Sequence, residues 1–149
     1  MNKFLSITTI YLIVTSIILL FPNLNQAREI LIYADSISYD KDDNIIARGN
    51  AKIFSNNKLI VSDLIIFNKE EEKIILPSKF TFKDENNNFF EGDDGFFLKN
   101  LNMAEFNNPK IKLNDGSRII GKKIKKNGKI DIISKGVYSP CKSRIKIGN

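Results

Sequence analysis

A short phrase recurs along this chain at nearly even spacing: an acidic residue is followed two and four positions later by large apolar residues. It reads Asp35-Ser36-Ile37-Ser38-Tyr39, then Asp63-Leu64-Ile65-Ile66-Phe67, then Asp94-Gly95-Phe96-Phe97-Leu98. A degenerate fourth copy has Lys122 in the acidic position, and the four positions are 28, 31 and 28 residues apart. Steps of two between apolar residues indicate β-strands with one buried face. A period of this length is typical of a repeated supersecondary unit, so the phrase predicts a sheet that winds round on itself.

The stretches between these phrases also read as strands and turns. Ala47, Gly49, Ala51 and Ile53 alternate with polar residues, and so do Phe80 and Phe82. Polar clusters separate such runs, and Asn127-Gly128 is a good two-residue hairpin signal. Residues 59–67 are apolar on both faces, which indicates either a central strand or one that faces a ligand. Short strands with no helical period between them predict an antiparallel all-β sandwich or roll.

The first 27 residues differ from the rest. Lys3 precedes an uncharged, mostly apolar run over residues 4–21, Pro22 breaks that run, and Ala27 offers a small residue for cleavage. This order is typical of a secretory signal peptide, and an uncleaved inner-membrane anchor is the alternative. Either interpretation predicts that the chain beyond Arg28 works outside the cytoplasm.

Charge is unevenly distributed along the 149 residues, a length that suits one domain. Residues 28–109 carry a net charge of −5, whereas residues 110–149 carry +10. The basic part therefore meets something anionic or forms a solvated face. The run Lys122-Lys123-Ile124-Lys125-Lys126 lacks the aromatic platform of single-strand binders, so no nucleic-acid partner is expected.

Catalysis finds little support in the residues. The chain contains no histidine, which excludes histidine bases, triads and histidine metal sites. Asp93 and Asp94 are neighbours on the chain and would point to opposite faces of a strand, so a turn suits them better than a catalytic pair. Cys141 is the only cysteine, so no cysteine cluster can hold zinc. We expect no enzyme, no cofactor and no metal site.

The order of these phrases resembles a known family. The stretches at residues 32–39, 47–53 and 59–63 are similar to the repeat of the OstA-like domain shared by the lipopolysaccharide-transport proteins LptA and LptD. The phrase Gly136-Val137-Tyr138-Ser139-Pro140-Cys141-Lys142 resembles the segment that links the amino-terminal domain of LptD to its barrel. The resemblance covers roughly residues 30–142 and is closest to that domain of LptD.

The resemblance implies an open β-jellyroll over residues 28–136, with residues 137–149 as the start of a connection to a barrel that this chain lacks. The implied role is to shield lipopolysaccharide acyl chains in a hydrophobic groove and pass them toward the outer membrane. The implied location is the periplasm, in association with the outer membrane. The implied partners are lipopolysaccharide, other Lpt jellyrolls joined by strand-edge pairing, and a separately encoded outer-membrane barrel. An intermolecular disulfide through Cys141 would link the chain to that barrel.

Two sets of residues are expected to form the site. Apolar residues of one parity would line the groove: Ile37, Tyr39, Ala51, Ile53, Ile65, Phe67, Phe80, Phe82, Phe96 and Leu98. Basic residues would contact the phosphorylated head group at its rim: Arg48, Lys52, Lys122 and Lys123. Three alternatives stay open. The apolar residues could simply pack against each other, the chain could be a structural connector without cargo, or it could be an inner-membrane-anchored protein of the LptC type.

Overall fold

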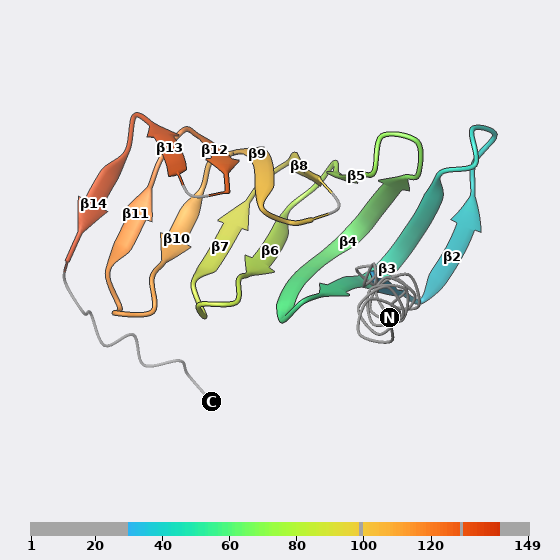
Figure 1. Cartoon of the computed structure of the whole chain (residues 1–149), viewed down its shortest axis with the longest axis horizontal. Coiled ribbons are helices and arrows are strands. Elements are labelled where there is room, and N and C mark those ends of the chain that lie inside the picture. The colour runs from blue at the N-terminus through green and yellow to red at the C-terminus, as the bar shows by residue number, and fades with distance from the viewer. Residues whose placement is uncertain (1–29, 99, 129, 141–149) are drawn as a thin grey trace, which may run out of the picture.

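The computed structural model describes residues 30–98, 100–128 and 130–140, and all regular secondary structure in this part is β. Fourteen strands form one antiparallel sheet, which confirms the predicted all-β fold (Figure 1). The strands are β1 (Leu31–Tyr33), β2 (Ser36–Tyr39), β3 (Ile45–Ser55), β4 (Lys58–Asn68), β5 (Lys73–Leu76), β6 (Phe80–Lys83), β7 (Phe89–Gly92), β8 (Gly95–Leu98), β9 (Met103–Asn107), β10 (Lys110–Lys112), β11 (Arg118–Ile120), β12 (Lys123–Asn127), β13 (Ile130–Ser134) and β14 (Val137–Ser139).

Some sequence-based predictions lie outside the described residues, namely the signal peptide at residues 1–27 and the disulfide at Cys141. Among the residues that are described, no helix is long and apolar enough to cross a membrane. The sheet extends three residues past the expected boundary at residue 136, because β14 pairs with β11. Asn127 pairs with Ile130, so β12 and β13 form a hairpin where the sequence predicted one.

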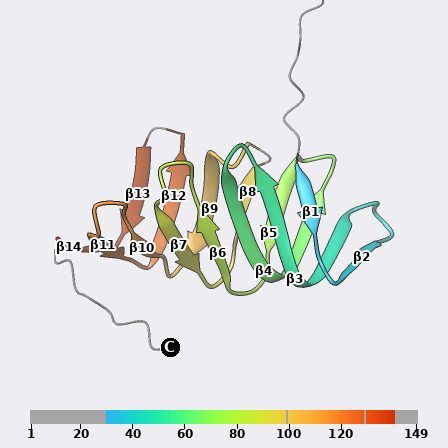
Figure 2. The same cartoon turned by 90° about the horizontal axis from the view of Figure 1, so that it is seen from below.

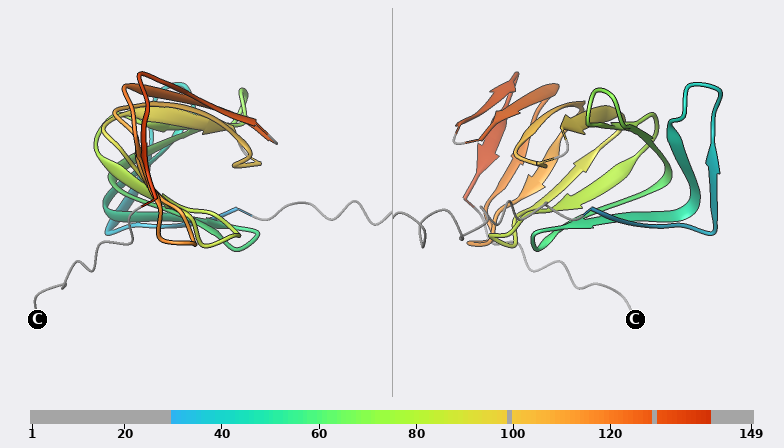
Figure 3. Two further views of the ribbon diagram at one scale, coloured as in Figure 1. Left: turned by 90° about the vertical axis from the view of Figure 1, so that its left-hand side faces the viewer. Right: turned by 45° about the vertical axis from the view of Figure 1, so that its right-hand side comes forward.

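The sheet is folded into two layers that face each other (Figure 3, left). The upper layer runs in the order β2, β3, β4, β5, β8, β9, β12, β13, and the lower layer in the order β1, β3, β4, β6, β7, β10, β11, β14. The 11-residue strands β3 and β4 belong to both layers, since one half of β4 pairs with β6 and the other with β5. The apolar stretch at residues 59–67 is therefore a central strand, one of the two interpretations of its sequence.

The two layers meet along a closed edge, where the chain turns a corner each time it passes between them. In β3 and β4 this corner is a β-bulge, because Gly49 and Asn50 together oppose Asp63. Gly49 and Asn50 have φ values of +74° and +47°, a region that glycine and asparagine tolerate. A β-carbon on Gly49 would also collide with the Asp35 carboxylate. The bulge sharpens the bend that folds one sheet into two layers.

The repeated acidic residues mark these corners. At one corner, the Asn50 side chain donates a hydrogen bond of 2.9 Å to Asp35 Oδ2. At another, the Asn108 side chain donates one of 2.8 Å to Asp93 Oδ2. Both members of the second pair lie 58 residues after those of the first. Because 58 residues span two repeats, each sequence repeat corresponds to one passage of the chain through both layers. Asp93 lies at a turn, as predicted.

The opposite side of the roll, called here the open side, carries the hairpin turns. Two of these turns share one design, in which a carboxylate accepts hydrogen bonds from the turn that follows. Asp40 binds the backbone and side chain of Asn44, and Asp84 binds those of Asn88. The hydrogen bond from the Asn44 side chain lowers the pKa of Asp40. These side chain to backbone bonds hold the tight turns of both layers in place.

Candidate functional site

The inner face of the lower layer is a continuous apolar row. Residues paired directly across neighbouring strands lie on the same face of a sheet. From β1 to β14 the row consists of Ile32, Ile53, Ile60, Phe82, Phe90, Ile111, Ile119 and Tyr138. Its middle members are buried, whereas Tyr138 at the end of the sheet is exposed. The apolar row therefore extends from β1 at one end of the sheet to β14 at the other, and Figure 2 shows these two strands at opposite ends.

The inner face of the upper layer carries a second row, which is apolar over most of its length and charged at one end. From β2 to β13 it consists of Tyr39, Ile45, Phe67, Ile74, Phe97, Ala104, Lys126 and Asp131. The members up to β9 are apolar or aromatic, and the last two are charged. An inner ion pair thus follows the apolar part of this row at the carboxy-terminal end.

Five phenylalanines fill the middle of the interior. Phe80, Phe82 and Phe90 come from the lower layer, and Phe97 and Phe106 come from the upper layer. Ring centroids of Phe82 and Phe97 lie 4.8 Å apart, and those of Phe80 and Phe106 lie 5.2 Å apart. Such tilted and edge-on contacts are favourable beyond the buried area alone. The layers are packed against each other here, so a guest molecule would have to displace part of this cluster.

Most of the expected groove residues lie in the interior. Five belong to its buried core: Ala51, Ile53, Ile65, Phe80 and Phe82. Phe67 is partly buried against that core. Ile37 and Tyr39 lie on β2 at the end of the sheet, where they are 49% and 65% exposed. These eight residues pack against each other or end the inner rows, and lipid contact by them stays a prediction.

The other two expected groove residues have the wrong parity. Phe97 is fully buried in the core, so Phe96 and Leu98 on either side of it alternate away from the interior. Phe96 instead lies under the Lys73 ammonium, 4.6 Å from its ring centroid. The prediction counted from Asp94, but Asp93 is the residue equivalent to Asp35 at the corners. Counting two and four positions from Asp93 gives Gly95 and Phe97, which are the inward residues.

Sequence reasoning also missed much of the core. The missed residues are buried on strands whose faces the phrase did not assign: Ile60, Ile74, Leu76, Phe90, Phe106 and Ile124. The alternation of Ile111 with Lys110 and Lys112 does predict its inward face, which is buried, although Ile111 was not among the expected groove residues. In doublets such as Phe89-Phe90, alternation leaves the choice of face open.

The expected head-group rim is not at the open side. Arg48 and Lys52 are exposed on the outward parity of β3, between buried inward residues. Lys122 lies at a corner of the closed edge, where its backbone amide binds Ser134. Lys123 forms an ion pair with Glu105, and its hydrogen bond lowers the pKa of that carboxyl. Arg48, Lys52 and Lys123 are on the outer face because they alternate with inward residues on their strands, and Lys122 is at the closed edge because it lies at a corner.

Two other lysines face inward near the open side. Lys58 begins β4 on the same parity as the buried Ile60, and its side chain is only 7% exposed. Lys126 belongs to the inner row of the upper layer and has a side chain that is 11% exposed. The sequence analysis assigned neither to the site. Within the described residues no group of His, Cys, Asp and Glu side chains could hold a metal ion.

Two layers of antiparallel strands are curled into a roll that is open along one side, and in the described residues each end strand pairs on one edge alone. These features define an open β-jellyroll. The solved structure of "LptH, the LptA homologous periplasmic component of the conserved lipopolysaccharide transport device from Pseudomonas aeruginosa" has this fold. It matches with a TM-score of 0.61 and 16% sequence identity, over 71% of this chain and 82% of that one. No protein-family model and no curated protein sequence matches the chain. The fold is therefore that of LptA-like β-jellyrolls, as the sequence predicted.

Proposed function

We propose that the chain is a non-enzymatic lipopolysaccharide-transport component of the periplasm that holds acyl chains between its two layers. The observation that carries this proposal is the apolar row that crosses the whole lower layer inside an LptA-like fold. Each buried methylene of an acyl chain contributes about 0.8 kcal/mol, so a few chains in this interior would bind firmly. Because the interior is filled by phenylalanines, acyl chains bind there only after the layers move apart.

The proposal also concerns where in a transport bridge this chain acts. The segment around Tyr138 resembles LptD, whereas the similar solved structure is an LptA homologue. We propose association with the outer membrane and a separately encoded barrel, with Cys141 as the residue that links them. A free-standing LptA-like component and an inner-membrane-anchored LptC-like protein are the alternatives.

A photo-crosslinking experiment tests the cargo role. Phe67 faces the interior and the adjacent Ile66 faces outward, and both are partly buried on β4. A photoreactive amino acid at Phe67 is expected to capture lipopolysaccharide at least about tenfold more efficiently than one at Ile66, because acyl chains gain by leaving water only on the inner face. Electrophoresis of irradiated periplasm with detection of lipopolysaccharide measures the capture.

Lys52, on the outer face of the lower layer, is a second control site and should give no adduct. Equal capture at Phe67, Ile66 and Lys52 would contradict binding between the layers. It would leave a connector as the better interpretation.

The free edges of the strands at the two ends support the connector role as well. Within the described part of the chain, β1 and β2 end the sheet at the amino-terminal side, and β13 and β14 end it at the other side (Figure 2). Since every strand pair is antiparallel, β13 runs opposite to β2, and β14 runs opposite to β1. A second copy placed end to end therefore continues both layers in the antiparallel sense. Exposed strand edges readily add strands from a neighbour.

Cysteine pairing tests this end-to-end contact in a Cys141→Ser background. Ser38 and Ile132 lie in the same outer row of the upper layer, at opposite ends of it. The double variant Ser38→Cys, Ile132→Cys is expected to form a ladder of disulfide-linked oligomers on non-reducing electrophoresis. The matched variant Ser38→Cys, Ile133→Cys should form far fewer, because Ile133 points to the inner face. Equal ladders, or none in either, would contradict the contact.

A further inference from the structure

Two lysines, Lys58 and Lys126, face the largely apolar interior of this roll, and their surroundings differ. A buried ammonium is costly unless an anion or hydrogen bonds compensate for lost hydration. Lys126 is well compensated, because its Nζ lies 2.5 Å from Asp131 Oδ2 on the neighbouring strand. The same Nζ lies 4.5 Å from the centroid of the Phe90 ring in the opposite layer. The charge of Lys126 is therefore matched within the protein.

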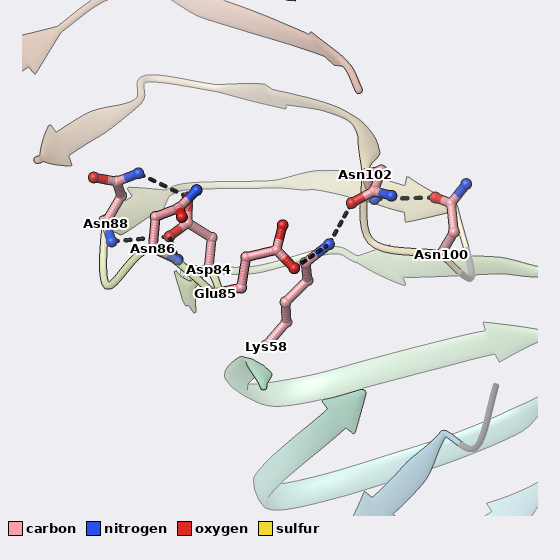
Figure 4. A network of polar contacts seen from close by, with 7 residues as sticks. All are labelled: Lys58, Asp84, Glu85, Asn86, Asn88, Asn100 and Asn102. Atoms are coloured by element: carbon pink, nitrogen blue, oxygen red, sulfur yellow. Dashed lines mark hydrogen bonds and ion pairs between the residues drawn. The ribbon is translucent and has the colours of Figure 1, made fainter. Parts of the chain in front are cut away.

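Lys58 is less well matched. Its Nζ donates a hydrogen bond to the neutral side-chain carbonyl of Asn102 (Figure 4). In the described residues its ion pair is with Glu85, at 3.8 Å, and the Glu85 side chain is 57% exposed. An exposed carboxylate at that distance is hydrated and compensates weakly. Since an ammonium has three N–H donors, Lys58 keeps donor capacity for an anionic oxygen.

The position of Lys58 in the fold also suits it to bind an anionic group. Lys58 begins β4 in the lower layer, whereas Asn102 precedes β9 in the upper layer, so their hydrogen bond crosses the open side. Beside Asn102, the side chain of Leu101 is buried in the core. The ammonium thus lies where the apolar interior meets the open side. An amphiphile with chains between the layers would bring its polar head to this point.

We propose that Lys58 anchors the phosphate of a phosphorylated, acylated lipid, and that this phosphate replaces Asn102 and Glu85 as the partner of the ammonium. This inference rests on the proposed function and adds the residue that recognises the head group. A charge-assisted hydrogen bond to phosphate is shorter and stronger than the bond to a neutral amide. Replacing the Asn102 contact also releases one link between the layers, which couples head-group binding to opening of the interior.

Titration of the purified protein with two lipids tests the anchor. The probes are lipid A and lipid A from which the phosphates have been removed, with inorganic phosphate as a third titrant. Lys58→Met is expected to weaken binding of phosphorylated lipid about tenfold and to leave binding of the dephosphorylated lipid unchanged. Lys58→Arg should keep the preference for phosphate. Lys52→Met, a lysine on the outer face, should behave like the unchanged protein.

The outcomes separate this inference from the proposed function. If the unchanged protein binds neither lipid, the proposed function fails. If it binds both lipids and Lys58→Met keeps the same preference, the anchor is wrong and the proposed function stands. Binding of inorganic phosphate that is as tight and as dependent on Lys58 as lipid binding would overturn a lipid anchor in favour of a free-phosphate site.

Circular dichroism and thermal melting show whether Lys58→Met folds. If it does not fold, a second variant tests the same anchor. Asn102→Asp places a carboxylate on the Lys58 ammonium without removing a charge from the interior. This carboxylate competes with phosphate, so the variant is expected to lose affinity for phosphorylated lipid A by about tenfold and to keep affinity for the dephosphorylated lipid. An unchanged preference for phosphorylated lipid in Asn102→Asp would overturn the anchor.

Discussion

Replacing Phe97 by alanine is expected to lower the free energy of unfolding by about 3–5 kcal/mol, the usual cost of emptying a phenylalanine site in a core. Phe97 is fully buried and contacts the rings of Phe80, Phe82 and Phe106. It joins the two layers at their centre, so neighbouring side chains cannot easily close the space. Urea denaturation followed by circular dichroism measures the change.

The adjacent residue gives a matched control. Phe96→Ala removes an equal number of atoms from the outer face, where the ring is partly exposed beneath the Lys73 ammonium. Its expected cost is about 1 kcal/mol, from the lost cation–π contact and partial burial. Equal costs for Phe96→Ala and Phe97→Ala would contradict the inner and outer faces assigned to β8.

The second large effect is expected at Gly95, where even one methyl group has no room. Gly95 pairs with Phe106, and a β-carbon on it would collide with the Phe106 β-carbon and the Glu105 carbonyl, and would come within 2.7 Å of the Phe106 α-carbon. Backbone atoms cannot move aside as a flexible side chain can. Gly95→Ala is expected to destabilise the protein by about 3 kcal/mol, at the upper end for overpacking, or to prevent folding. Thermal and urea denaturation measure it.

Gly128 provides the control for this substitution. It has a φ of +62°, and no atom lies within 4 Å of a β-carbon built on it. Asparagine tolerates this backbone region, so Gly128→Asn is expected to cost less than about 1 kcal/mol. A Gly95→Ala protein as stable as Gly128→Asn would show that β8 and β9 do not pair as described.

The filled interior constrains how cargo could enter. The closed edge is continuous, because β3 and β4 run through both layers and the corner residues bind one another. Across the open side, the layers are joined by the hydrogen bond between Lys58 and Asn102 and by the buried Leu101. Separation is therefore easiest on the open side, where side-chain contacts rather than backbone ladders must break.

The sequence alone determined the strands, the turns and the coiled sheet, because these depend on local patterns. Alternation at Ala47, Ala51 and Ile53 places a strand with one dry face, and the evenly spaced acids mark a repeated corner. Residues such as Phe80 and Phe82 could be assigned to the interior because polar residues flank them. Local alternation is enough wherever one face of a strand is clearly apolar and the other polar.

Only the tertiary structure decided which face is inward where both are apolar, and which cations meet the interior. In β4 the inward residues change parity between Ser62 and Ile65, because the strand turns the corner there. Because of that change, Lys58 faces inward. In the doublet Phe96-Phe97, the inward residue depends on whether Asp93 or Asp94 lies at the corner. Counting alternate residues assigns two faces to a strand, but only long-range pairing shows where each corner lies and which face is inward. The inward lysines were therefore beyond sequence patterns, since their faces depend on strands far away in the chain.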